Sequence, residues 1–291
     1  MSVLRVTHRT EYRYRYPVVL GPHRLMCRPR DSHDLRLLDT GITIKPQPSE
    51  LRWMHDVFGN SIAIATFFDS TTDLIFESTF RAEHFPLPER ILVLDDYAVT
   101  LPLSYSASEA VDLGSSIARH YADPEHKLDA WVKSLLDRTG TKTLDVLMAM
   151  MHAIKSEFTY LRREEVGVQT PVRTLELRAG SCRDFAVFMI DAVRFLGLAA
   201  QFVSGYLYDE ALIDADSGLV GGGATHAWIQ VYLPGVGWVE FDPTNALMGG
   251  RNLIRVAVAR EAAQAAPLIG SFTGNTDDFL SMHVTIEVTA E

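Results

Sequence analysis

The most informative stretch of the chain covers residues 179–185 and reads AGSCRDF. Ser181 can cap a helix that begins directly after it, and Asp184, three residues later, completes a capping-box pattern. Apolar residues follow at helical spacing, and Gly197 is a typical helix end. The pattern therefore predicts that Cys182 lies in the first turn of a helix, where unpaired N–H groups and the helix dipole favour a thiolate.

A reactive cysteine needs a base, and the base needs a group that orients it. On position alone Cys182 is more simply a small buried residue, as most free cysteines are. Among the ten histidines, His226 fits the role of base best, because it opens an expected strand directly after the glycine-rich loop at 221–223. Asp242 comes sixteen residues later, at the end of the next expected strand. These three residues form a candidate Cys-His-Asp set.

The loop between the two strands tests this set. If Leu233 faces Trp238 across a four-residue turn, Asp242 points away from His226 and is simply a turn residue before a proline. If the loop has three or five residues, or the pair contains a bulge, His226 and Asp242 can oppose each other on one face. A triad therefore requires an odd loop or a bulge.

Composition narrows the class of protein. The chain has 291 residues, of which 47% are hydrophobic and 22% charged, so it can bury a core and is not a disordered chain. Its 27 basic and 37 acidic residues give a net charge of −10, which argues against nonspecific nucleic-acid binding and against an anionic membrane surface. We find no signal-peptide pattern and no apolar stretch of the roughly 18 residues that a membrane span needs.

The two cysteines, Cys27 and Cys182, lie far apart in the sequence and form no CxxC pair. This spacing argues against a disulfide framework and predicts a reducing, cytoplasmic location. A zinc site built from Cys182, His226 and Asp242 is a weak alternative, since no short-spaced pair would anchor the ion. We therefore expect no metal and no other cofactor.

Hydrophobic patterning predicts an α+β protein with two regions. Residues 1–100 show alternating runs separated by turn signals about every ten residues, which is typical of an antiparallel β-sandwich. Residues 101–291 begin with helices and continue with strands, which indicates helices packed on an antiparallel sheet. We expect helices from Ser106 or Ser108, from Asp123-Pro124 and from Thr143, and we place the C-terminal strands at 253–258 and 282–289 in this second region.

Several motifs together resemble the bacterial transglutaminase-like family of the papain-like cysteine-enzyme superfamily. In the second region they are GSCRDFA at 180–186, AQFVSGY at 200–206, HAW at 226–228, VYLPG at 231–235, GW at 237–238 and FDPTN at 241–245. In the first region Tyr12, Tyr14, Pro17, RPR at 28–30, Pro46 and DVFGN at 56–60 resemble the β-domain that precedes the core in this family. The resemblance covers nearly the whole chain, and it implies a papain-like transglutaminase core.

By this resemblance Cys182 matches the nucleophile, His226 the general base and acid, and Asp242 the residue that orients the imidazole. The implied reaction is attack of the thiolate on an amide or peptide carbonyl, followed by transfer of the acyl group to an amine or to water. The resemblance also implies protein or peptide substrates and allows for ligase-like protein partners; it leaves the oligomeric state open.

The oxyanion would be held by the Cys182 backbone N–H, with Tyr160, Gln169 or Trp228 as candidates for a second donor. Each of these three side chains is more simply explained as a packing residue than as a donor. The sequence does not separate a peptidase or amidase from an acyl transferase. A non-catalytic peptide- or protein-binding module on the same fold is the alternative, although an intact Cys-His-Asp set argues against it.

Overall fold

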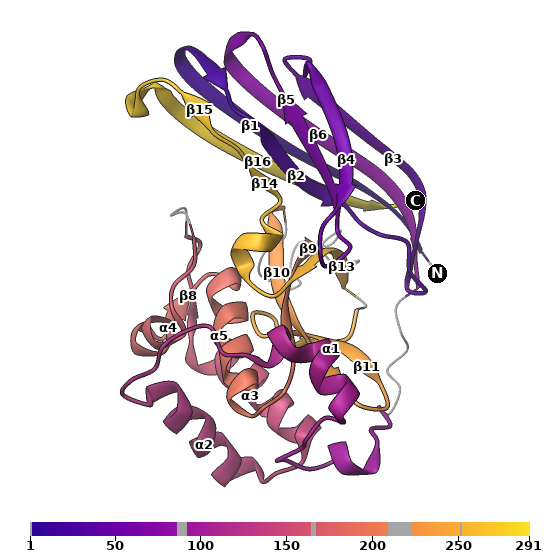
Figure 1. The fold of residues 1–291 in the computed structure, drawn as a ribbon, viewed down its shortest axis with the longest axis vertical. Coiled ribbons are helices and arrows are strands. Elements are labelled where there is room, and N and C mark those ends of the chain that lie inside the picture. The colour runs from indigo at the N-terminus through magenta and orange to yellow at the C-terminus, as the bar shows by residue number, and fades with distance from the viewer. Residues whose placement is uncertain (1, 86–91, 164–166, 209–222, 251) are drawn as a thin grey trace.

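A computed structural model describes residues 2–85, 92–163, 167–208, 223–250 and 252–291. In Figure 1 a strand-rich part, coloured indigo, purple and yellow, lies above a part in which helices lie beside a second set of strands. The predicted α+β class is confirmed, with the antiparallel β-sandwich in the first region. Gly221 and Gly222 of the expected glycine-rich loop lie outside the described residues.

Two antiparallel sheets form the sandwich. The first contains β1 (Ser2–Leu20), β3 (Leu35–Lys45), β6 (Ser70–His84), β15 (Phe272–Thr273) and β16 (Phe279–Ala290). The second contains β2 (His23–Arg28), β4 (Glu50–His55), β5 (Ser61–Thr66) and β14 (Leu268–Ile269). Alternate side chains of both sheets form one apolar layer between them, including Leu25, Ala63, Leu74 and Phe76.

The C-terminal strands correct the expected division of the chain. We placed the strand at 282–289 with residues 101–291, but β16 pairs with β1 from Leu4↔Ala290 to Tyr14↔Phe279. β14 and β15 likewise pair with β2 and β1. The physical reason is the apolar face of β16, where Ile286 packs with Leu4 and Val6 of the first strand. Alternation predicts a strand, but it does not specify the strand's partner.

The second part is built on a five-stranded antiparallel sheet in the order β12-β11-β10-β9-β13. Its strands are β9 (Ala200–Leu207), β10 (Thr225–Leu233), β11 (Gly237–Asp242), β12 (Leu247–Met248) and β13 (Leu253–Ala259). The helices are α1 (Ala107–Ile117), α2 (Lys127–Thr139), α3 (Thr143–Glu157), α4 (Pro171–Leu177) and α5 (Cys182–Phe195). A short parallel pair, β7 (Thr159–Tyr160) and β8 (Ala179–Gly180), precedes α5.

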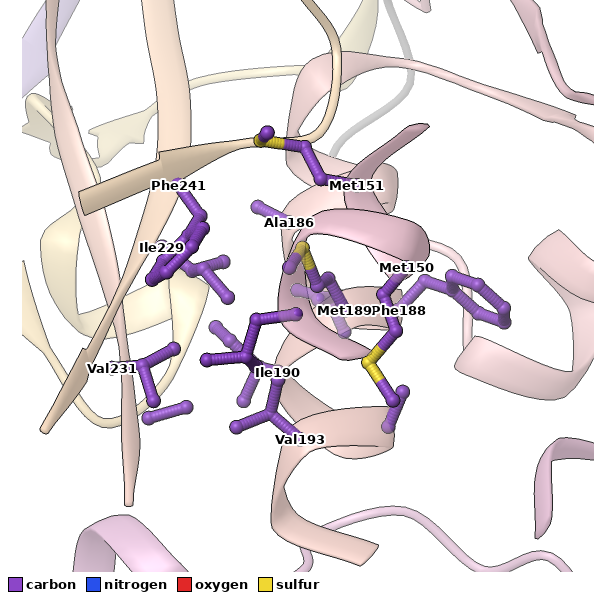
Figure 2. Close-up of a cluster of buried hydrophobic side chains, with 14 of the residues drawn as sticks. Met150, Met151, Ala186, Phe188, Met189, Ile190, Val193, Ile229, Val231 and Phe241 are labelled. Carbon is purple, nitrogen blue, oxygen red and sulfur yellow. The ribbon is translucent and has the colours of Figure 1, made fainter. Parts of the chain in front are cut away.

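Helix α5 is the centre of this part. Figure 2 shows its Met189, Ile190 and Val193 side chains between α3 and the sheet, which contributes Ile229 and Phe241. Ile190 is 3% exposed and Met189 is fully buried, so α5 is enclosed on several sides. This burial fixes the first turn of α5, which carries Cys182, relative to β10 and β11.

The helix starts were predicted with mixed success. Ser106 caps α1 with a capping box, as expected. The second helix begins at Lys127 and not at Pro124, because the Asp123 carboxylate accepts hydrogen bonds from the backbone N–H groups of Lys127 and Leu128 and so caps the helix from outside. Thr143 is the first residue of α3 and its hydroxyl donates to the Ala98 carbonyl, so it does not act as the cap. No helix among the described residues has the length and apolar character needed to cross a bilayer.

Candidate active site

Cys182 is the first residue of α5, as the sequence predicted, and it is 7% exposed. The Ser181 backbone N–H donates to Asp184 Oδ2 at 2.8 Å, and the Ser181 hydroxyl donates to the same oxygen at 2.9 Å. Gly180 is required beside this turn, because a Cβ there would lie 2.8 Å from the Cβ of Asp184. The AGSCRDF stretch therefore forms a tightly packed helix start with the sulfur in its first turn.

The carboxylate of Asp184 ties this helix start to the segments that flank it. Asp184 is fully buried and accepts hydrogen bonds from Arg163 Nη1 at 2.8 and 2.9 Å and from the Gln169 backbone N–H at 2.7 Å. Burial raises the pKa of Asp184, but the hydrogen bonds from Gln169, Ser181 and Arg163 outweigh this effect and hold the pKa below its usual value. Asp184 therefore does more than cap the helix, which is all that its sequence position indicated.

The hairpin between β10 and β11 places His226 and Asp242 on the same face of the sheet. Leu233 pairs with Gly237 and Ile229 with Phe241, so the connecting loop has three residues, 234–236. This odd loop confirms the register that a triad requires. Continuing the register sets Asp242 across from Trp228, so that Asp242 and His226 are diagonal neighbours and do not directly oppose each other.

His226 and Asp242 are joined by a buried hydrogen bond. His226 Nε2 lies 2.8 Å from Asp242 Oδ2, and the two side chains are completely buried. The other carboxylate oxygen accepts from the Thr244 backbone N–H at 2.9 Å, and Asn245 Nδ2 donates to Oδ2 at 2.8 Å. Asn245 is a residue that our sequence reasoning missed, although the Asp-Pro-Thr-Asn turn contained the signal.

His226 and Asp242 each stabilise the charged form of the other. Burial lowers the pKa of His226, but the charge of Asp242, the hydrogen bond to it and the nearby Cys182 thiol raise the pKa to about 10. Burial raises the pKa of Asp242, but the imidazole and the hydrogen bonds from Asn245 and Thr244 bring the pKa below its usual value. The result is an imidazolium–carboxylate pair at neutral pH.

The thiol of Cys182 lies near this imidazole. Nε2 is used by Asp242, whereas Nδ1 is buried and has no partner of normal hydrogen-bond geometry within the described residues. Cys182 is near enough to the imidazole to contribute to its raised pKa. The structure therefore brings Cys182, His226 and Asp242 into one cluster, in which the carboxylate holds the imidazole and the thiol lies near it.

The three candidate oxyanion donors lie in different surroundings. Tyr160 pairs with Gly180 across β7 and β8, and burial followed by the charge of Cys182 raises the pKa of its phenol. Gln169 contacts Asp184 through its backbone, and its buried Oε1 lacks a hydrogen-bond partner among the described residues. Trp228 is fully buried, and its ring stacks on His226 with centroids 5.9 Å apart. Burial favours a packing role for Trp228 and leaves Tyr160 and Gln169 as candidates.

The described residues contain no group of three or more His, Cys, Asp or Glu side chains that could hold a metal ion. In particular, Cys182, His226 and Asp242 do not form such a group. The His226 imidazole is hydrogen-bonded to the Asp242 carboxylate and lies near the Cys182 thiol, an arrangement that suits proton transfer.

Comparison with known proteins places the chain in a family. Residues 4–83 match the model for the bacterial transglutaminase-like N-terminal region, and residues 130–243 match that for the transglutaminase-like superfamily. Over 98% of its length the chain is 31% identical to an uncharacterized protein of Mycobacterium tuberculosis strain H37Rv, of which it covers 91%. The chain belongs to the bacterial transglutaminase-like family.

Other relatives agree with this membership. An uncharacterized protein of Mycobacterium leprae is 25% identical over 98% of both chains. A solved structure named "a Putative Cysteine Protease from Cytophaga hutchinsonii" matches with a TM-score of 0.70 and 20% identity, covering 99% of this chain and 90% of that chain. At this identity the match shows the fold alone. The two family models confirm the expected transglutaminase-like core and the N-terminal β-domain that precedes it.

Proposed function

We propose that this protein is a thiol enzyme that acts on amide or peptide bonds, with Cys182 as nucleophile, His226 as general acid and base, and Asp242 as the orienting carboxylate. One observation carries the proposal: the Asp242 carboxylate holds the buried imidazole through Nε2 at 2.8 Å and leaves Nδ1 for the sulfur at the start of α5. The bacterial transglutaminase-like family and the protease-like fold support it.

The proposed reaction follows from the roles of these groups. The Cys182 thiolate attacks the carbonyl carbon, and the C=O electron pair moves to the oxygen to give an oxyanion. The oxyanion collapses while His226 gives its proton to the departing nitrogen, which leaves an acyl-thioester on Cys182 and a free amine. Water or a second amine then gives a proton to His226 and attacks the thioester, which releases the thiolate and an acid or a new amide.

The proposed oxyanion donors are the Cys182 backbone N–H, at the N-terminus of α5, and the Tyr160 hydroxyl. The first turn of a helix presents N–H groups without intrahelical partners. Tyr160 is favoured over Gln169 because its phenol is near enough to Cys182 to sense the charge of the sulfur. Positioned donors of this kind stabilise charge that develops in the transition state.

The substrate proposed is a protein or peptide, and both hydrolysis and transglutaminase-type transfer are compatible with the site. Ligase-like partners and a cytoplasmic location stay predictions. A direct test is incubation with a glutamine peptide and a labelled amine, comparing the wild type with Cys182→Ala. Labelled peptide indicates transfer and cleaved or deamidated peptide indicates hydrolysis; a product that persists in Cys182→Ala contradicts the role of the thiol.

Alkylation by iodoacetamide tests the cluster without a substrate, because the thiolate is the reacting form and a neighbouring imidazolium stabilises it. Cys27 is an internal control, since burial raises the pKa of its thiol to about 12. We expect alkylation of Cys182 at pH 6 and none of Cys27, measured on the two peptides by mass spectrometry. A Cys182 that reacts only above about pH 8.5, as an ordinary thiol does, would favour the non-catalytic binding module.

A further inference from the structure

The sandwich meets the core sheet around a polar cavity of about 200 Å³, lined from one side by Asp34 and His84 and from the other by Glu240 and Arg255. Arg255, on β13, spans the cavity. Its Nη2 lies 3.2 Å from Asp34 Oδ2 and its Nη1 lies 3.0 Å from Glu240 Oε1. These charged groups pair with one another, so the cavity contains a bridge between the two parts of the chain.

Glu240 is the residue of this bridge that lies in the core sheet. It lies on β11, two residues before Asp242, and its side chain is 7% exposed. Burial raises the pKa of Glu240, whereas Arg255 and the indole N–H of Trp228 oppose that rise. Nε1 of Trp228 has no hydrogen-bond partner of standard geometry among the described residues, so its interaction with Glu240 is weaker than a normal hydrogen bond. Glu240 pairs with Gln230 across the hairpin, so Trp228 is its diagonal neighbour on the same face of the sheet. Arg255 pairs with Gly205, the residue against which the Trp228 ring packs.

Trp228 in turn forms one wall of the imidazole site. Its ring and that of His226 are stacked, with an interplanar angle of 29°. The indole is enclosed by Val203, Leu207 and Leu253, and a Cβ at Gly205 would lie 2.6 Å from its Cη2 atom. The ring of His226 is thus fixed at one nitrogen by Asp242 and on one face by Trp228.

We propose that Arg255 is a positioning residue for His226: by joining Asp34 of the sandwich to Glu240 of the core, it holds Trp228 against the imidazole. This inference rests on the proposed function, and it gives the N-terminal β-domain a part in the reaction without placing any of its residues at the sulfur. A second set of contacts between the two parts also involves strand β13. Asn60 Nδ2 donates to the Val258 carbonyl at 2.6 Å, and Asn60 Oδ1 accepts from the Val258 N–H at 2.9 Å.

The test is the pH profile of Cys182 alkylation in the full chain with Arg255→Met. The matched control is Arg119→Met, because Arg119 also bridges two carboxylates, Asp129 and Asp191, and its side chain is 28% exposed against 30% for Arg255. We expect both variants to lose thermal stability. Only Arg255→Met should lower the alkylation rate at pH 6, by about fivefold or more, within the roughly 10²-fold that small misplacements cause. Arg255→Lys should recover part of the rate.

The results distinguish failure of the proposed function from failure of the positioning role of Arg255. A wild-type Cys182 that alkylates like an ordinary thiol rejects the proposed function and the positioning role together. A reactive wild type with an unchanged profile in Arg255→Met rejects the positioning role alone, as does an equal loss in Arg119→Met. If Arg255→Met does not fold, Asp34→Asn breaks only the outer half of the bridge and should lower the rate in the same direction; an unchanged rate in that variant also rejects the role.

Discussion

Replacing Asp242 by Asn should remove the positive charge of the His226 imidazole at neutral pH and lower the reactivity of the Cys182 thiol. Asn keeps the size of the side chain and removes the carboxylate that raises the pKa of His226 to about 10. A rise from 6.5 to about 10 corresponds to about 5 kcal/mol in favour of the imidazolium. Without this charge, burial prevails and His226 becomes neutral near pH 7, so that Cys182 loses its cationic neighbour.

The pKa shifts of His226 and Asp242 determine how the loss of stability in Asp242→Asn depends on pH. The raised pKa of His226 stabilises the fold fully below pH 6.5, and this contribution is lost as the pH rises toward about 10. The lowered pKa of Asp242 contributes above its ordinary value of 3.8 and is lost at lower pH. The difference in free energy of unfolding between wild type and Asp242→Asn should therefore be largest between about pH 4 and 6.5, at about 3–5 kcal/mol.

Two assays check this prediction. Urea unfolding at pH 5, 6.5, 8 and 9.5 should give a difference that shrinks as the pH rises, and alkylation of Cys182 at pH 6 should slow tenfold or more. Asp191→Asn is the control, because Asp191 is a buried carboxylate that pairs with Arg119 and not with a histidine. A variant Asp242→Asn with the wild-type alkylation profile, or with a stability difference independent of pH, would refute the reasoning.

Three further changes test other parts of the account. Tyr160→Phe should lower kcat/KM on the substrate found by about 10²-fold and leave Cys182 alkylation unchanged, since only the oxyanion is affected; Tyr121→Phe is the control, and equal activity in both variants would remove Tyr160 from the site. Gly205→Ala should destabilise the fold by about 1–3 kcal/mol in thermal or urea unfolding, because the added Cβ overlaps the Ile254 carbonyl oxygen and the Trp228 ring; an unchanged melting temperature would contradict that packing. Deleting residues 1–100 leaves β16 without β1, so we expect aggregation on size-exclusion chromatography, and a folded monomer would show that the pairing is dispensable.

The sequence predicted the local features of the site better than the long-range ones. The helix start at Cys182 and the strands of His226 and Asp242 follow from capping and alternation, which act over a few residues. Alternation left two possibilities for the loop between the strands: a four-residue turn that separates His226 from Asp242, and an odd loop or a bulge that brings them to one face. It could not choose between them, because that choice depends on how Pro234 to Val236 turn in space.

Hydrophobic patterning and capping signals could not predict the contacts between distant segments. The pairing of β16 with β1, the bridge from Asp34 through Arg255 to Glu240, and the gathering of Arg163 and Gln169 around Asp184 all join residues far apart in the chain. Each depends on the tertiary packing of elements that the sequence predicts one by one. Asn245 differs, because its bond to Asp242 is local and the turn sequence contained it.

The most direct measurement is the mass of the protein after incubation with an activated ester of a glutamine-containing peptide. We predict a peptide-acyl adduct on Cys182 that turns over with water or amine, is absent in Cys182→Ala, and forms much more slowly in His226→Ala. A folded wild-type protein in which Cys182 carries no acyl group, or in which His226→Ala acylates at the wild-type rate, would contradict the claim that the thiol and the imidazole work as one unit.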